Sequence, residues 1–94
     1  MPLQFKRYRG HDFDRRVCKF SMMNGEKEVR FVASWELMDD LERTSDTRAD
    51  QRDEQFERLQ GPLIAIAERK FFSMLDAERP ADIALLTEDR QRIL

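Results

Sequence analysis

The sequence predicts an α+β fold: a small three- or four-stranded antiparallel sheet, built from a β-hairpin and a C-terminal strand, with two helices packed on one face. Three observations predict it. An Asn-Gly pair at 24–25 stands between two β-like runs, an apolar stripe at helical spacing runs through residues 56–67, and a short apolar run follows at 83–86. The 94 residues suit a single domain, residues 1–94, because one core usually serves about 50 to 200 residues.

The composition predicts a folded, soluble chain. It is 40% hydrophobic and 38% charged with a net charge of −2, whereas disordered chains combine low hydrophobicity with high net charge. The longest uninterrupted apolar run, 63–67, is far shorter than the roughly 20 residues of a membrane span, and no apolar stretch follows the basic first ten residues. Cys18 is the only cysteine. These features predict a cytoplasmic protein with no membrane association.

A two-residue turn at 24–25 sets the register of the expected hairpin, residues 17–32. The pairs expected are Phe20 with Val29, Cys18 with Phe31, and Val17 with Val32. Cys18, Phe20, Val29 and Phe31 then form one apolar face. In the same register Lys19 faces Arg30 on the other side, which is mildly unfavourable.

A short helix is expected directly after the hairpin. Ser34 is a good N-cap, Glu36 in the first turn favours the positive end of the helix dipole, and Trp35, Leu37, Met38 and Leu41 form its apolar stripe. Residues 44–49 are the expected loop. Near the N-terminus, Leu3 and Phe5 alternate with polar residues, which fits an additional edge strand.

The main helix is expected to begin near residues 46–50. Its apolar stripe is Phe56, Leu59, Leu63 and Ile66. Gly61-Pro62 interrupts the pattern, because an interior proline removes a backbone hydrogen bond, so either one helix kinks there or two helices meet. The unbroken apolar phase favours the kinked helix. After a loop at 76–82, residues 83–86 read as a short buried strand that pairs with the hairpin, and Thr87 is placed to cap a final turn.

This order of elements resembles the small bacterial proteins of the family called domain of unknown function 1488 (DUF1488). The stretches that carry the resemblance are 11–14 with 17–20, 29–41 with Ser34 as cap, 56–71 (FERLQGPLIAIAERKF) and 83–89. The chain departs from the family at Gly61-Pro62, where the family's helix is continuous. The resemblance implies a fold and no catalytic residues.

Few residues carry a chemical signal. His11, the only histidine, lacks a motif that would orient it as a base, and we expect it in an exposed loop. Cys18 has basic neighbours, but the hairpin register turns it inward, so we expect a buried structural cysteine. One acidic group lacks the glycine and the ligand spacing of a calcium loop: Asp39, Asp40, Glu42 and Asp46. A second group shares a helix face but has no histidine and no ligand from a second helix, so we interpret it as surface acids favoured by the helix dipole: Asp50, Asp53, Glu54 and Glu57. The sequence therefore predicts no catalytic site, no metal and no cofactor.

Charge asymmetry is the remaining functional signal. Residues 1–30 hold eight Lys/Arg and four Asp/Glu, a net +4, so the remainder carries −6. The candidate binding residues are Lys6, Arg7, Arg9, Arg15 and Arg16, which surround Tyr8 in sequence. We expect a small non-enzymatic binding or accessory protein that acts through contacts with a protein partner or with a second copy. The alternative is a weak, phosphate-directed nucleic-acid binder, against which the pI of about 5.4 argues.

Overall fold

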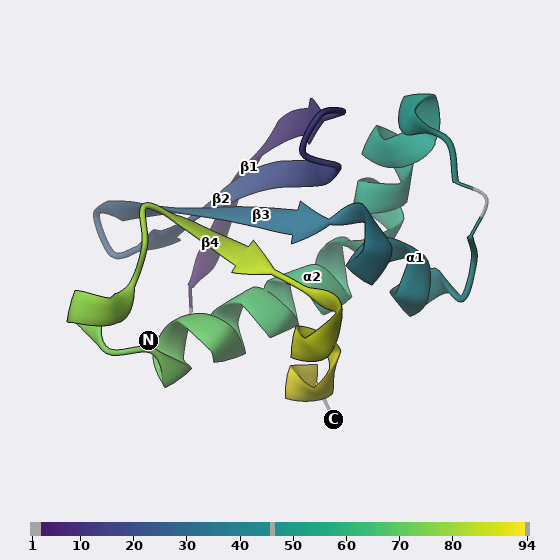
Figure 1. Ribbon diagram of the computed structural model, residues 1–94. Coiled ribbons are helices and arrows are strands. Elements are labelled where there is room, and N and C mark those ends of the chain that lie inside the picture. Colours follow the sequence, from purple (N-terminus) through teal and green to yellow (C-terminus); the bar gives the residue numbers. More distant parts are fainter. Residues whose placement is uncertain (1–2, 46, 94) are drawn as a thin grey trace.

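A computed structural model describes residues 3–45 and 47–93 (Figure 1). Its elements are β1 (Gln4–Asp12), β2 (Val17–Asn24), β3 (Lys27–Ser34), α1 (Trp35–Glu42), α2 (Arg52–Ser73) and β4 (Asp82–Leu85). Single 3-10 turns at Ala49–Gln51 and Asp76–Glu78 flank α2, and Thr87–Ile93 is also 3-10. The predicted α+β class is confirmed, as are the N-terminal edge strand, the short helix after Ser34 and the C-terminal strand.

The four strands lie in the order β1-β2-β3-β4. The first three pair antiparallel, whereas β4 runs parallel to β3, so the sheet is mixed rather than purely antiparallel. The direction of β4 follows from the connection that precedes it. The 22 residues of α2 span about 33 Å and return the chain to the start of β3, and β4 must then run the same way as β3.

The hairpin register differs from the one expected. Asn24 pairs with Lys27, so the turn residues are Gly25 and Glu26. Gly25 takes the positive φ of 64° that the first central position of a type II′ turn requires. Phe20 consequently opposes Phe31 and Lys19 opposes Val32, which removes the expected Lys19–Arg30 pair. Each β2 residue pairs with a β3 residue two positions further along the chain than expected. Because side chains alternate along a strand, a shift of two leaves the same side chains on the inner face.

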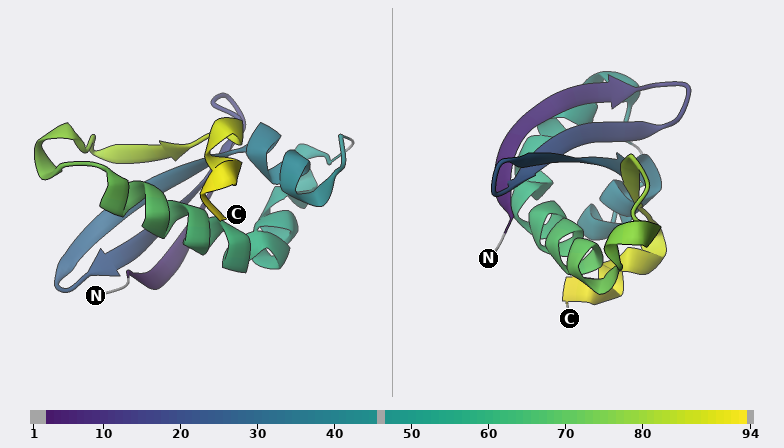
Figure 2. Two further views of the ribbon diagram at one scale, coloured as in Figure 1. Left: turned by 90° about the horizontal axis from the view of Figure 1, so that it is seen from below. Right: turned by 90° about the vertical axis from the view of Figure 1, so that its left-hand side faces the viewer.

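Helix α2 covers the inner face of the sheet and forms the core with it (Figures 1 and 2). Its predicted stripe is buried: Phe56, Leu59, Leu63 and Ile66. The Phe20 ring lies 5.3 Å from Phe31 and 5.2 Å from Phe56, between centroids. The helix continues through Gly61 and Pro62 without a break, and the ribbons show it curving beneath the strands. A single helix is therefore confirmed, and two separate helices are excluded.

Helix α1 stands at the end of β3, beside the first turns of α2 (Figure 1). The Ser34 hydroxyl accepts a hydrogen bond from the Leu37 N–H at 3.0 Å, which confirms the predicted cap. The helix ends at Arg43, which adopts the left-handed conformation at φ 55°. Neither helix in the part of the chain described is long and apolar enough to cross a membrane.

Candidate binding cleft

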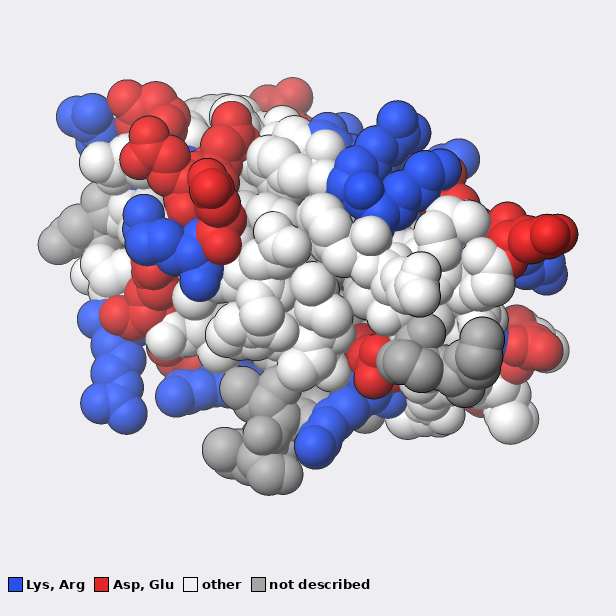
Figure 3. Space-filling view, turned by 180° about the vertical axis from the view of Figure 1, so that it is seen from behind, with Lys and Arg blue, Asp and Glu red and all other residues white. Residues whose placement is uncertain are grey.

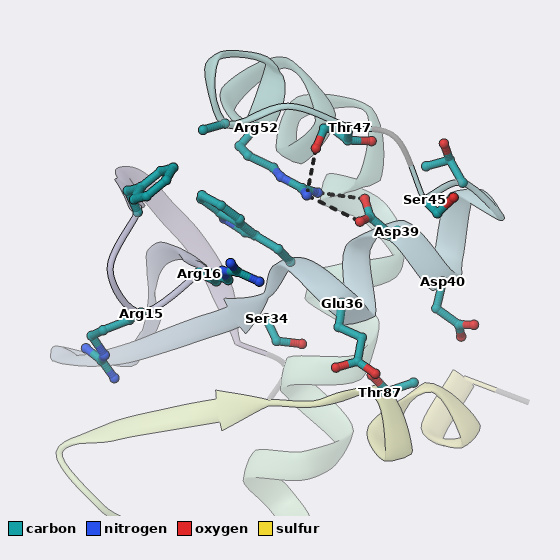
Figure 4. A pocket seen from close by; sticks show the side chains of 14 residues that line it. Arg15, Arg16, Ser34, Glu36, Asp39, Asp40, Ser45, Thr47, Arg52 and Thr87 are labelled. Atoms are coloured by element: carbon teal, nitrogen blue, oxygen red, sulfur yellow. Dashed lines mark hydrogen bonds and ion pairs between the residues drawn. The ribbon is translucent and has the colours of Figure 1, made fainter.

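An open cleft of about 730 Å³ lies where β3 ends and α1 begins (Figure 4). One wall is the β1–β2 turn, with Phe13, Arg15 and Arg16. The opposite wall comes from α1 and from the loop that leads to α2, and Thr87 closes the lower side. The cleft thus draws on three stretches that are distant in sequence: the β1–β2 turn, residues 34–52, and Thr87.

The β1–β2 turn is held in one conformation by its own hydrogen bonds. The Asp12 carboxylate accepts the N–H groups of Asp14 at 3.1 Å and Arg15 at 3.2 Å. Arg16 has a positive φ of 54°, and its carbonyl accepts the Trp35 N–H at 2.9 Å. The last of these bonds ties the turn to the start of α1, so the turn presents its exposed side chains from a fixed backbone.

The aromatic part of the cleft is formed by Phe13 and Trp35. The Phe13 ring is 64% exposed and meets the Trp35 ring edge-on, with centroids 6.0 Å apart. Trp35 itself is nearly buried. The exposed Phe13 ring thus contacts a second aromatic ring, and Arg15 and Arg16 line the same cleft. An apolar group of a ligand could therefore pack against the exposed Phe13 ring without a change in the cleft.

Beside the Trp35 ring lies a buried ionic network centred on Arg52 (Figure 4). Arg52 is 5% exposed; it donates to Asp39 Oδ1 at 2.6 Å and to the Thr47 carbonyl at 3.0 Å. Its guanidinium also lies over the Trp35 ring, 4.6 Å from the centroid. Burial raises the pKa of the Asp39 carboxyl, but hydrogen bonds from Arg52 and Gln55 outweigh this and keep the pKa below its usual value. The network fixes the floor of the cleft.

The two arginines at the edge of the cleft differ from its carboxylates in whether they are paired. Arg15 and Arg16 make no side-chain hydrogen bond or ion pair with any described residue, whereas Asp40 on the far wall is paired with Arg90 at 2.9 Å. Glu36 is exposed on the lower side, close to Thr87 in Figure 4. Two guanidinium groups on one wall, unpaired with any residue in 3–45 and 47–93, are therefore suited to a ligand that carries a negative charge.

A second polar network lies behind Trp35 and joins β1 to α2. Asp53 accepts a hydrogen bond from the Tyr8 hydroxyl at 2.5 Å and lies 2.9 Å from His11 Nδ1. Hydrogen bonds from Tyr8 and His11 hold the pKa of the Asp53 carboxyl below its usual value. Burial, together with the Asp53 contact, raises the pKa of the Tyr8 hydroxyl. This network clamps the edge strand onto the helix.

The contacts of Asp53 with Tyr8 and His11 show that two expectations from the sequence were wrong. His11 lies in β1 rather than in a loop, and Asp53 binds two β1 side chains in addition to favouring the helix dipole. The separation of 42 residues between His11 and Asp53 left no local signal of their contact. Cys18 is fully buried, as expected, and burial raises the pKa of its thiol.

The five predicted binding residues do not form one surface. Arg15 and Arg16 stand at the cleft, whereas Arg7 lies on the outer face of the sheet, opposite Ser21. Lys6 reaches Glu28 of β3 with 3.5 Å between Nζ and Oε2, and Arg9 is half-buried in β1. Arg15 and Arg16 belong to the β1–β2 turn, whereas Lys6, Arg7 and Arg9 lie within β1.

The acidic groups do not converge on a common point. Within residues 3–45 and 47–93, no cluster of three or more His, Cys, Asp or Glu is placed to hold a metal ion. Asp46 lies outside the described residues. Asp39 and Glu42 are instead bound by Gln55, at 3.0 and 3.2 Å, in the network around Arg52.

Comparison with known proteins bears on the fold. No protein-family model and no curated protein matches the sequence. One solved structure matches with a TM-score of 0.61 at 11% identity, covering 88% of this chain and 90% of the other: the crystal structure of a protein of unknown function from the DUF1488 family of Shewanella loihica PV-4. The resemblance predicted from the order of elements is confirmed at the level of three-dimensional structure. The chain has the fold of a DUF1488 family protein.

Proposed function

We propose that the chain is a small non-enzymatic binding protein that acts in the cytoplasm through protein–protein contacts, with the cleft between the β1–β2 turn and α1 as the contact site. The observation that carries this proposal is the combination of an exposed aromatic ring, Phe13, with two guanidinium groups, those of Arg15 and Arg16, that pair with none of the described residues, all on one fixed turn. Aromatic and arginine side chains dominate the energetics of protein interfaces.

The rigidity of the turn favours binding. The Asp12 carboxylate and the bond from Trp35 N–H to the Arg16 carbonyl hold the backbone in place. A preordered surface loses less conformational entropy when a partner docks. The partner segment that suits this site carries a carboxylate near an apolar side chain, because the carboxylate pairs with the arginines while the apolar group packs on Phe13.

The chemistry of the lining supports binding over catalysis. The described residues that line the cleft include the hydroxyls of Ser34 and Thr47 but neither histidine nor cysteine. Glu36, Asp39 and Asp40 supply carboxylates, of which Asp39 and Asp40 are already paired with arginine. A hydroxyl nucleophile would need an adjacent general base, and the hydrogen bonds from Arg52 and Gln55 that lower the pKa of Asp39 make that carboxylate a weaker proton acceptor.

Affinity purification from the native cell tests the proposal, with and without nuclease. The wild-type chain is expected to retain a protein in nuclease-treated extract, and Arg15→Glu/Arg16→Glu is expected to lose it. Lys27→Glu, at the hairpin tip, is the matched control and should retain the partner. Retention by the double variant would contradict a role for the cleft, and a partner that vanishes with nuclease would contradict direct protein contact.

A second candidate, weak binding of nucleic-acid phosphates, is favoured by the outer face of the sheet. Arg7 and Arg30 flank Ser21 across three adjacent strands on the face that α2 does not cover. Fluorescence anisotropy with a labelled random duplex tests it. Each neutralised phosphate adds about −0.9 to the salt slope, so Arg7→Gln/Arg30→Gln should reduce the slope by about two. No binding at micromolar protein in low salt would exclude this candidate.

A further inference from the structure

Exposed apolar side chains lie at both ends of α2. Among the side chains that the structure describes, four large apolar ones are exposed: Phe13, Phe72, Leu75 and Leu86. Phe13 belongs to the cleft, which also includes the first residue of α2, whereas Phe72 and Leu75 lie in the last turn of that helix and directly after it. The 22 residues of α2 span about 33 Å, and the longest dimension of the molecule is 36 Å. The two sites therefore lie at opposite ends of the molecule (Figure 1).

We call residues 13–16 the head and residues 72–79 the tail. The tail presents an apolar side chain beside a carboxylate: Leu75 is 71% exposed, and the Asp76 side chain is 93% exposed. The Glu78 N–H donates to the Leu75 carbonyl at 2.8 Å, and Glu78 Oε1 accepts the Leu75 N–H at 3.1 Å. These bonds close the tail into a turn, so the tail, like the head, offers its side chains from a backbone that is already fixed.

Head and tail carry net charges of opposite sign. The head holds two arginines and one aspartate, a net +1, and the tail holds two acids and one arginine, a net −1. The arginine of the tail, Arg79, turns inward, because its guanidinium lies 3.7 Å from the Phe71 ring centroid and donates to the Phe71 carbonyl at 3.0 Å. Asp76 contacts Arg79 through Oδ1. A carboxylate has a second oxygen that can accept a guanidinium from another chain.

The back of the molecule does not divide its charges in this way. Seen from behind, charged side chains of both signs lie on both sides of a largely uncharged middle (Figure 3). Charge thus favours a contact between the two ends over a contact across this face. A contact between unlike ends is heterologous, so it repeats from one copy to the next instead of closing a two-fold dimer.

We propose that the tail of one copy of the chain docks in the cleft of the next copy. This inference rests on the proposed function of the cleft and names its partner as a second copy. Leu75 of one copy packs on the Phe13 ring of the next, and Asp76 accepts hydrogen bonds from the arginines of that head. The tail meets the requirement of the cleft, a carboxylate beside an apolar side chain. Because head and tail lie at opposite ends of the long axis, successive copies form a linear chain.

Sedimentation of the purified full-length chain tests this docking, at about 10 µM to about 1 mM, which reaches the weak affinities of small interfaces. The average mass should rise past that of a dimer with concentration, and it should fall in high salt because exposed ion pairs are screened. The head variant Arg15→Glu/Arg16→Glu and the tail variant Leu75→Ala/Asp76→Lys should each weaken association at least about 10-fold. Glu57→Lys, exposed on α2 between the two ends, is the control and should associate as the wild type does.

A mixture of the two variants decides the outcome. The head variant keeps an intact tail and the tail variant keeps an intact head, so one contact forms between them and the pair cannot extend. The equimolar mixture should therefore form a complex of one chain of each, although each variant alone is a monomer. Circular dichroism confirms that each variant is folded. A wild-type chain that stays monomeric over the whole range would overturn the proposal, and so would a mixture that associates no better than its components.

This result is separable from that of affinity purification, because sedimentation uses the purified chain alone. If the chain stays monomeric while a different protein is retained from extract through Arg15 and Arg16, docking of a second copy is overturned and the cleft keeps its proposed function. If the chain self-associates and the tagged chain retains untagged copies of itself from extract, both proposals are supported.

Discussion

Replacing Asp39 with alanine should destabilise the fold more than replacing Arg52 with methionine, although the two side chains are partners. The reason is their unequal access to water. The Arg52 side chain is 6% exposed and that of Asp39 is 19% exposed. Arginine stays charged at any ordinary pH, so the loss of Asp39 leaves a buried cation without its counter-ion. Loss of Arg52 leaves a carboxylate that water can reach.

The expected magnitudes follow from the bonds that remain. Removal of one member of a buried ion pair costs about 3 to 5 kcal/mol. Arg52 would keep its bonds to the Thr47 carbonyl at 3.0 Å and to Gln55 Oε1 at 2.6 Å, so we expect the lower end, about 3 kcal/mol, for Asp39→Ala. For Arg52→Met we expect about 1 to 2 kcal/mol, because methionine can still cover the Trp35 ring. Total stability for such a domain is about 5 to 15 kcal/mol.

Urea denaturation measures both changes, followed by far-UV circular dichroism and by the fluorescence of Trp35, the only tryptophan. The double variant Asp39→Ala/Arg52→Met should cost less than the sum of the single variants by more than about 1 kcal/mol, because the buried cation and its counter-ion leave together. The reasoning is refuted if Asp39→Ala costs no more than Arg52→Met, or if the two costs add.

Three further predictions concern the core, the helix cap and acid stability. Phe31→Ala should lower stability by about 3 to 5 kcal/mol, because the ring is fully buried; an unchanged thermal midpoint would contradict its place in the core. Ser34→Ala should cost about 1 kcal/mol in urea denaturation, since the Leu37 N–H loses its acceptor; no loss would mean that the cap is dispensable. The thermal midpoint should fall as the pH drops below about 4, because the Asp53 and Asp39 carboxyls have folded pKa values below their unfolded ones. Their stabilisation is complete above the unfolded pKa and is lost as the pH falls through the folded pKa. A midpoint that stays level from pH 7 to 2 would contradict this.

The sequence by itself determined the elements and their inner faces. Ser34 capped the expected helix, and the stripe from Phe56 to Ile66 marked the helix face that became buried. The inner face of the hairpin was predicted correctly even though the register was not, because side chains alternate along a strand and a shift of two residues keeps each on its side. These properties depend on residues close together in the chain.

Tertiary structure alone decided the rest. The turn lies at Gly25-Glu26 instead of the expected Asn24-Gly25, and in that register Phe20 stacks on Phe31. Strand β4 runs parallel to β3 because α2 is long enough to return the chain to the start of that strand. Asp53 meets Tyr8 across 45 residues, and the cleft combines three stretches that are distant in sequence. Local propensity and apolar period carry no information about which distant polar groups will meet. Those contacts arise only when burial of the apolar faces brings the elements together.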